Sequence, residues 1–390
     1  MATFEQAEYE ARIARTKAEM AARGLDALVV TDVANMHWLT GYDGWSFYTP
    51  QCVVIGQELE QPLWIGRGID VNGARVTTFL KPEHIHPYPD DYVQTPLKHP
   101  MGWAGQVLEG YGLGGKRIGV ETDSYYFSPR ALGALQGALP NASFQDADLL
   151  VNWLRIVKSP AEIALMQQAG EIMDLVMSTA IESIDPGVRQ CDAAAAIYRA
   201  AVSGTPEFGG DYPAIVPMLP TGLGTSTPHL TWSDAPFRSG EATILELAGC
   251  RLRYHCPQAR TLFLGSPPQR LAEAAKWVVE GIEAALAAAR PGATAEAVER
   301  AWRETVARGG LLKESRIGYS CGLNYPPDWG EHTLSLRPGD TTELKPDMTI
   351  HLIPGIWQDD WGIEISECFR VIERGAEPFC TTPRELIVKR

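Results

Sequence analysis

The side chains that could do chemistry in this sequence are few, and the first is an acid inside an apolar pattern. Glu246 interrupts the period-two apolar stretch Ala242–Leu247. A carboxylate there could act as a base, attack an electrophilic carbon, or pair with N–H donors. The imidazoles of His229 and His255 lie nearby in the chain and could move a proton near neutral pH. The structural alternatives are a strand carboxylate paired with an arginine and histidines that are solvated or packed.

The composition of the chain excludes several classes of binding partner. The 390 residues carry 48 acidic and 34 basic side chains, a formal net charge of −14, and a negative surface repels nucleic-acid phosphates. The first twenty residues contain no apolar signal segment, and no apolar run is long enough to cross a membrane. The seven cysteines are scattered, without a CxxC pair, which indicates free thiols in a reducing compartment. We therefore expect a cytoplasmic protein that binds neither nucleic acid nor membrane.

The order of apolar patterns predicts two domains. Helical and strand patterns alternate up to about residue 150, which is typical of an α/β domain, and amphipathic helices with β-rich stretches follow. We predict an N-terminal domain over 1–150 and an α+β catalytic-type domain over 151–390. The expected helices are Phe4–Arg23, one that begins near Ser128, Ser159–Ser183, Arg270–Ala289 and Ala295–Arg308; the expected strands and β-rich stretches are Ala27–Thr31, Cys52–Ile55, Pro62–Ile65, Arg117–Glu121, Ala242–Leu247, Leu252–Leu264 and Met348–Phe369.

Four segments resemble, in order, motifs of the creatinase and aminopeptidase P family. Leu154–Glu162 is similar to the linker that enters the family's pita-bread domain, and Arg260–Gly265 is similar to its Arg-Thr strand. Gly318–Gly322 is similar to its Gly-His-Gly-Ile-Gly turn, and Pro354–Trp357 is similar to its Glu-Pro-Gly-Ile-Tyr strand. The likeness extends over essentially the whole chain. It implies a creatinase-type N-terminal α/β domain followed by an α+β pita-bread catalytic domain. It also implies a homodimer in which the N-terminal domain reaches the partner's active site.

The same resemblance implies that the family's two-metal site has been lost. The peptidases hold two metal ions with two aspartates, a histidine and two glutamates. At those positions this sequence has, in order, Glu246, Pro257, Tyr319, Ile353 and Ser366. Proline and isoleucine cannot bind a cation, and a pair of cations needs several anionic or imidazole ligands. We therefore expect no metal and no other cofactor.

The resemblance to creatinase, a metal-free C–N hydrolase of the same fold, implies roles for several residues around the lost metal site. Its catalytic histidine precedes the first lost aspartate position by seventeen residues, and His229 precedes Glu246 by the same interval. His255 replaces a tyrosine that contacts the substrate. Phe47 matches a phenylalanine that the N-terminal domain of creatinase contributes to the active site of the neighbouring subunit. Thr49 replaces an arginine that holds the carboxylate of creatine, which disfavours creatine as the substrate.

Three strings are similar to the bacterial ectoine hydrolases of this family: Asn35–Tyr48, Arg253–Pro257 and Tyr325–Glu331. The likeness implies that ectoine, and hydroxyectoine as a further candidate, is opened at its cyclic amidine to give N-acetyl-2,4-diaminobutyrate. Such a reaction needs a group that holds the amidinium, a nucleophile and a proton shuttle. The expected catalytic residues are Glu246, His229 and His255, and the expected substrate contacts are Trp45, Phe47, Tyr319, Arg260, Glu331 and Glu364.

Other functions remain open at this point. A metal-dependent Xaa-Pro aminopeptidase-like enzyme with an unusual ligand set would gain activity with manganese or cobalt. A creatinase-like hydrolase would act on another small amidine or guanidine. A binding module that has lost catalysis would bind a small ligand without turnover.

Overall fold

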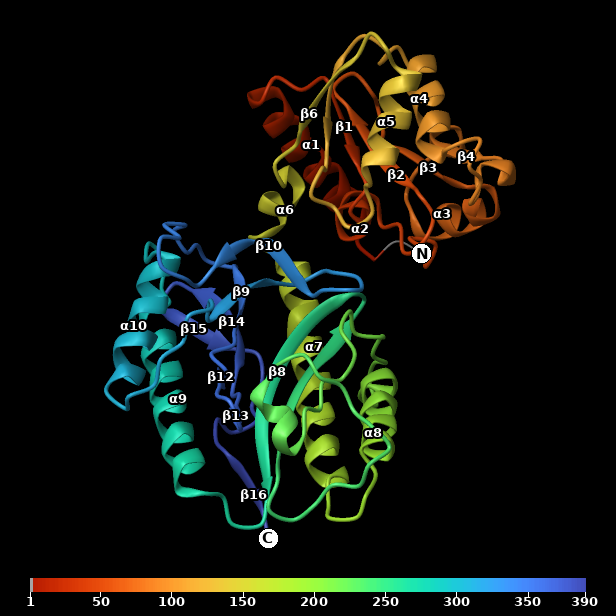
Figure 1. Ribbon diagram of the computed structural model, residues 1–390. Coiled ribbons are helices and arrows are strands. Elements are labelled where there is room, and N and C mark those ends of the chain that lie inside the picture. Colours follow the sequence, from red (N-terminus) through yellow and green to blue (C-terminus); the bar gives the residue numbers. More distant parts are fainter. Residues whose placement is uncertain (1–2) are drawn as a thin grey trace. The chain divides into compact units, whose positions relative to one another are not determined.

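A computed structural model describes residues 3–390, which fold into two compact units, Met1–Arg155 and Ile156–Arg390 (Figure 1). Met1 and Ala2, at the start of the predicted N-terminal domain, lie outside the described residues. The predicted boundary between residues 150 and 151 falls inside α6 (Leu150–Arg155). This helix is tied into the first unit, because Asn152 and Arg155 hydrogen-bond to Asn35 at 2.7 and 2.6 Å.

The first unit is built on a six-stranded mixed sheet with strand order β4-β3-β2-β1-β5-β6. Strand β1 pairs antiparallel with β2 and parallel with β5. The apolar core on one face of the sheet includes Leu108 of α4 and Leu135 of α5. The strands are Ala27–Val30, Cys52–Gly56, Leu63–Arg67, Ile85–Tyr88, Arg117–Val120 and Ser143–Asp146; α1 to α5 are Gln6–Ala22, Val33–Thr40, Val71–Thr77, Pro100–Gly110 and Pro129–Ala138, with short 3-10 turns at Gly68–Asp70, Pro82–His84 and Asp90–Tyr92.

The second unit begins with the helix that its sequence signals predict. In α7 (Pro160–Ser183) the Ser159 side chain accepts from the Glu162 N–H at 3.2 Å, and the Glu162 carboxylate accepts from the Ser159 N–H at 2.8 Å. This reciprocal capping satisfies two backbone donors that the first turn would otherwise leave unpaired. Strand β7 packs closely on the helix: a side chain at Gly249 would lie 2.1 Å from the Ala169 carbonyl, so only glycine fits there.

The strands of the second unit form three sheets, ordered β10-β9-β11-β14-β15, β16-β8-β7 and β12-β13. Figure 1 shows α7 and α8 on the opposite side of this unit from α9 and α10, and α9, α10 and the five-stranded sheet share one apolar core. No helix within residues 3–390 is long and apolar enough to span a membrane. The remaining helices are Gln190–Ser203, Gln269–Ala288 and Ala295–Ala307, with the 3-10 turn η4 at Gly222–Ser226; β7 to β16 are Ala242–Arg251, Tyr254–Leu264, Gly318–Cys321, Gly330–Ser335, Thr349–Leu352, Ile356–Trp357, Gly362–Ile363, Glu367–Ile372, Gly375–Pro378 and Ile387–Lys389.

Candidate active site

The candidate site lies in the second unit, where β7 and β8 meet the segment around Glu364. Glu246 of β7 stands opposite Ala259 of β8 in the antiparallel register, and the side chains of such a pair point to the same face. Thr261, two residues further along β8, fixes the backbone of Glu364. Its hydroxyl donates to the Glu364 carbonyl at 2.9 Å and accepts from the Glu364 N–H at 2.8 Å. Two glutamates far apart in the sequence are thereby brought to one site.

Glu364 is a buried acid that no hydrogen bond satisfies. Its neighbours Ile363, the last residue of β13, and Ile365 belong to the apolar core, and the Glu364 side chain is fully buried beside them. Both carboxyl oxygens are buried and have no hydrogen-bond partner within residues 3–390. Burial, and then the nearby negative charge of Glu246, raise the pKa of Glu364 well above its ordinary value. Burial therefore favours the protonated form of this carboxyl group.

Glu246 is also buried, with 5% of its surface exposed. Burial, followed by the negative charge of Asp328, raises the pKa of Glu246 to about 7. The neutral and ionised forms are therefore close in free energy at neutral pH. A cation that arrives beside Glu246 favours the ionised form, which is the form that can bind N–H donors or act as a nucleophile.

One cation faces this acidic pair, and the sequence analysis missed it. Lys313, which is 7% exposed, donates from Nζ to the Gly355 carbonyl at 2.8 Å and lies 4.1 Å from the centre of the Trp357 ring. Burial lowers the pKa of Lys313 to about 8, although the charge of Glu364 opposes that shift. A side chain at Gly355 would collide with the Trp357 ring and lie 3.2 Å from the Glu364 Cγ atom. Glycine at this position lets the lysine, the indole and the acid gather around one point.

A chain of hydrogen bonds crosses the floor of the site. Trp329 Nε1 donates to the Tyr319 hydroxyl at 2.9 Å, and that hydroxyl lies 3.1 Å from His351 Nδ1. His351 Nε2 is 2.8 Å from the Ser366 hydroxyl, which accepts from the Ala259 N–H at 2.6 Å. Burial and then the positive charge of Arg316 lower the pKa of His351 to about 3. His351 is thus a neutral connector, and the sequence analysis missed it although it lies two residues before Ile353 in the β-rich stretch.

The residues present do not fit the family's pair of metal ions. Pro257 and Ile353 have no ligand atom, and the hydroxyls of Tyr319 and Ser366 are both hydrogen-bonded to an imidazole. Glu246 is the only carboxylate at the five inherited positions. Within residues 3–390 no group of three or more His, Cys, Asp and Glu side chains could hold a metal ion.

The two histidines predicted to be catalytic have different surroundings. His255 is fully buried, and both ring nitrogens are engaged: Nε2 accepts from the Ala214 N–H at 2.8 Å and Nδ1 faces the Gly322 carbonyl at 3.3 Å. Burial lowers the pKa of His255 to about 4, so it is neutral and has no nitrogen left for a substrate. His229 lies exposed in the loop after η4 and makes no hydrogen bond or ion pair within residues 3–390.

Two predicted substrate contacts lie in buried ion pairs. Every Arg260 nitrogen donates to the protein: to Glu367 at 2.6 Å and to four backbone carbonyls at 2.6–2.8 Å. Glu331 pairs with Lys158 Nζ at 2.9 Å. The Arg260 guanidinium therefore has no donor left for a small molecule, and the charge of Glu331 is compensated by a buried lysine. Tyr319 and Glu364, by contrast, are near enough to Glu246 for its charge to raise the pKa of each.

The predicted aromatic contacts belong to the first unit. The Phe47 ring lies 4.8 Å from that of Trp45 and 5.7 Å from that of Tyr126, measured between ring centres. Trp45 is 55% exposed and Tyr48 is 64% exposed. The loop therefore presents a small aromatic surface, which is unusual on a single soluble domain and typical of a surface that contacts a partner or ligand.

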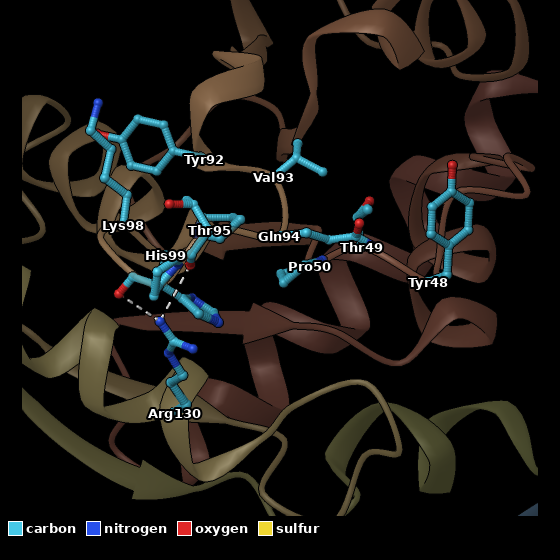
Figure 2. Close-up of a pocket in the computed structure, with 12 residues that line it drawn as sticks. Tyr48, Thr49, Pro50, Tyr92, Val93, Gln94, Thr95, Lys98, His99 and Arg130 are labelled. Carbon is cyan, nitrogen blue, oxygen red and sulfur yellow. Dashed lines mark hydrogen bonds between the residues drawn. The ribbon is translucent and has the colours of Figure 1, made fainter.

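A cavity of about 390 Å³ opens beside this loop and is shown in Figure 2. Tyr48 lies at the opposite end of the view from Lys98. The two cations of the lining are engaged locally: Lys98 pairs with Asp91, and Arg130 donates to the backbone carbonyls of Thr95 and Pro96. The cavity thus offers little uncompensated charge, and the acidic cluster of the second unit remains the candidate active site.

Comparison with known proteins identifies the class. Residues 12–157 match the creatinase/prolidase N-terminal domain, and residues 164–373 match metallopeptidase family M24. The structure superposes on a dipeptidase from Pyrococcus horikoshii OT3 with a TM-score of 0.82 at 21% identity, covering 97% of this chain and 100% of that one. A prolidase from Thermococcus sibiricus gives a TM-score of 0.84 at 20% identity, covering 98% and 99%.

The fold is thus the two-domain pita-bread architecture expected from the sequence, and the enzyme class is a hydrolase that acts on C–N bonds. The chain belongs to the creatinase and aminopeptidase P family, within metallopeptidase family M24. Among its relatives, the ectoine hydrolase of Halomonas elongata is 48% identical over 99% of this chain and 98% of that protein. An uncharacterized hydrolase/peptidase of Sinorhizobium fredii, y4tM, is 46% identical over 99% and 98%. The resemblance to ectoine hydrolase expected from the sequence is confirmed.

Proposed function

We propose that this protein hydrolyses ectoine without a metal ion and opens the cyclic amidine to N-acetyl-2,4-diaminobutyrate. The observation that carries the proposal is the buried pair Glu246 and Glu364, of which Glu246 occupies the position of the family's first metal ligand. Two acids kept together out of water favour a positively charged ligand. The identity of 48% to an ectoine hydrolase over nearly the full length of both chains supports a cyclic amidinium as that ligand.

Glu246 is the residue proposed to act on the amidine carbon. An amidinium offers two N–H donors that a carboxylate can accept in a charge-assisted fork. The cation also shifts Glu246, whose pKa is about 7, toward its ionised and nucleophilic form. Glu246 could instead direct a water molecule. We favour direct attack and a covalent intermediate, because the donor set fits no metal that would generate hydroxide.

The other predicted residues are proposed to act around this step. Tyr319, held by Trp329 and His351, borders the carboxylate and shapes the pocket. His229, in its exposed loop, exchanges protons between the site and solvent. His255, Arg260 and Glu331 support the site through the contacts described above rather than through the substrate.

The aromatic loop of the first unit is proposed to complete the site of a second subunit. Phe47 and Trp45 would stack on the delocalised cation, an arrangement that stabilises amidinium groups. The exposure of Trp45 is consistent with such a role. We accordingly propose a cytoplasmic homodimer in which each catalytic unit receives aromatic side chains from its partner.

The test is incubation of the purified protein with ectoine, with and without EDTA, followed by NMR of the products. The proposal predicts loss of the ring signals and appearance of an N-acetyl signal at equal rates in both samples. Glu246→Gln should abolish the conversion, with Glu299→Gln, a change at a buried acid paired with Arg303, as the control. Turnover of an Xaa-Pro dipeptide after addition of manganese, or of creatine in place of ectoine, would refute the proposal in favour of another member of the fold.

A further inference from the structure

Glu364 has a placement that its structural surroundings do not explain. Its backbone is fixed by Thr261, whereas both carboxyl oxygens are buried without a partner in the described chain. An unsatisfied buried polar group destabilises a fold, so its presence in a native protein calls for an explanation such as a catalytic role. A buried carboxyl group without a hydrogen-bond partner favours its protonated form, and in that form it holds a proton that it can release to a ligand.

The charged groups around Glu364 can promote release of its carboxyl proton when a substrate binds. Burial and then the negative charge of Glu246 favour the protonated form of Glu364, whereas Lys313, in the segment after α10, favours its ionised form. Once a cationic substrate neutralises Glu246, the charge that opposes ionisation of Glu364 is reduced and that of Lys313 remains. The bound substrate therefore prepares Glu364 to act as an acid.

The other groups near the reaction are poor donors. His351 is neutral, and both of its nitrogens are bonded to the hydroxyls of Tyr319 and Ser366. His255 is neutral, with both nitrogens facing the backbone. Burial raises the pKa of Tyr319 well above its ordinary value, so its hydroxyl holds its proton tightly. Departure of a ring nitrogen needs a proton, and Glu364 is the acid that the described site offers.

Resting on the proposed function, we propose that Glu364 is the general acid that protonates the departing ring nitrogen. Glu246, or water directed by it, forms a new C–O bond at the amidine carbon and gives a tetrahedral centre with two nitrogen substituents. The bond from this carbon to one nitrogen breaks, and that nitrogen takes the bonding pair and the proton from the Glu364 carboxyl group. Glu364 then regains a proton from the water that supplies the new carbonyl oxygen. The net reaction adds one water, and the released amine ends as an ammonium.

Lys313 has a supporting role in this scheme. After the transfer Glu364 is a buried carboxylate, which would be unfavourable alone, and the Lys313 ammonium lies close enough to stabilise it. The hydrogen bond to Gly355 and the face of Trp357 keep the lysine in place. Lys313 is a positioning and charge-balancing residue, since it acts through Glu364.

The experiment uses full-length Glu364→Gln, which keeps the shape of the side chain but cannot release a proton, and Glu299→Gln as the matched control. We expect Glu364→Gln to lower kcat for ectoine by about 100-fold or more, the usual contribution of a general acid, with little change in KM. Glu364→Ala should recover part of its kcat when formic acid is added, because a small acid can enter the vacated space. Unchanged kcat, or a rise in KM alone, would overturn the inference and assign Glu364 to substrate binding or to structure.

A second measurement separates this inference from the identity of the substrate. In the substrate-free protein at neutral pH, the infrared spectrum should contain a protonated-carboxyl C=O band that Glu364→Gln removes and Glu299→Gln does not. Absence of that band would overturn the inference whatever the substrate. If the band is present but the wild type does not convert ectoine, the proposed function fails while the neutral acid stands, and kcat is then compared on the cyclic or acyclic amidine that the wild type does convert.

Discussion

His351 Nε2 lies 2.8 Å from the hydroxyl of Ser366, the residue at the position of the family's last glutamate ligand. The other ring nitrogen faces Tyr319, which occupies the histidine position. The side chains at two of the family's ligand positions are therefore joined to each other through an imidazole. The hydrogen-bond chain fills space and satisfies polar groups that a pair of cations would otherwise organise.

From this arrangement we predict that the enzyme needs no metal. Purified protein should contain far less than one equivalent of manganese, cobalt or zinc by elemental mass spectrometry, and prolonged dialysis against EDTA should leave kcat for ectoine unchanged. A metal-dependent Xaa-Pro dipeptidase treated in the same way is the control and should lose activity. A stoichiometric metal, or activity that is lost to EDTA and restored by manganese, would contradict the prediction.

The dependence of kcat/KM on pH should reflect the two buried acids. Below about pH 7 Glu246 is largely neutral in the free enzyme and cannot pair with the cation, so kcat/KM should fall about tenfold per pH unit on the acid side. On the alkaline side it should fall where Glu364, whose pKa is raised well above its ordinary value, loses its proton. Because the groups interact, the two apparent values belong to the pair.

Glu364→Gln separates the two limbs of this profile. The variant should keep the acid limb at about the same pH, because burial and then the charge of Asp328 set the pKa of Glu246, and it should lose the alkaline limb. An acid limb near pH 4.5 in the wild type would mean that Glu246 is solvated and would contradict the site geometry.

Removing the acid at position 246 should stabilise the fold at alkaline pH. The pKa of Glu246 is raised from 4.5 to about 7, so its contribution to stability is fully present below pH 4.5 and is lost as pH rises through 7. A shift of this size corresponds to about 3 kcal/mol. Glu246→Gln should therefore melt above the wild type at pH 8 and close to it at pH 4.5, as measured by calorimetry. A lower melting temperature at pH 8 would show that the carboxylate has a stabilising partner.

Much of the fold could be predicted because its signals are local. The capping sequence Ser159–Glu162 marks the start of α7, and the apolar run that begins at Ala27 marks β1. Lys313 and His351 were missed for a physical reason: each acquires its role from residues on other strands or loops. From the sequence, Lys313 would be assigned to the surface. Only the structure shows that it contacts Gly355 and Trp357.

The two predicted substrate contacts in ion pairs illustrate the same limit. An arginine or glutamate within a family motif can be taken for a ligand-binding group, because the sequence does not reveal how many of its hydrogen bonds are made to other groups of the protein. In the structure Arg260 bonds to Glu367 and to backbone carbonyls, and Glu331 bonds to Lys158. Their substitution should therefore change stability more than substrate affinity.

The Arg260→Met variant tests whether Arg260 stabilises the fold and does not bind the substrate. The change leaves Glu367 buried and without its arginine, and breaking a buried pair in this way costs about 3–5 kcal/mol. We expect a clear fall in the melting temperature and an unchanged KM for ectoine at a temperature where the variant is folded. Arg199→Met, at a position where the side chain forms no ion pair within residues 3–390, controls for the loss of an arginine. A raised KM with normal stability would instead assign Arg260 to the substrate carboxylate.

Mixing a weakened variant with an inactive one tests whether Phe47 contributes to the active site of the partner subunit. Phe47→Ala should weaken turnover in a homodimer because each site lacks the aromatic face, and Glu246→Gln should abolish it because each site lacks the acid. In a mixed dimer, the catalytic unit of the Phe47→Ala chain retains Glu246 and receives Phe47 from the other chain, so one complete site forms. Differently tagged chains, co-expressed and purified through both tags, should recover up to half of the wild-type kcat per dimer. Recovery no greater than that of Phe47→Ala would show that the aromatic loop acts within its own subunit or not at all.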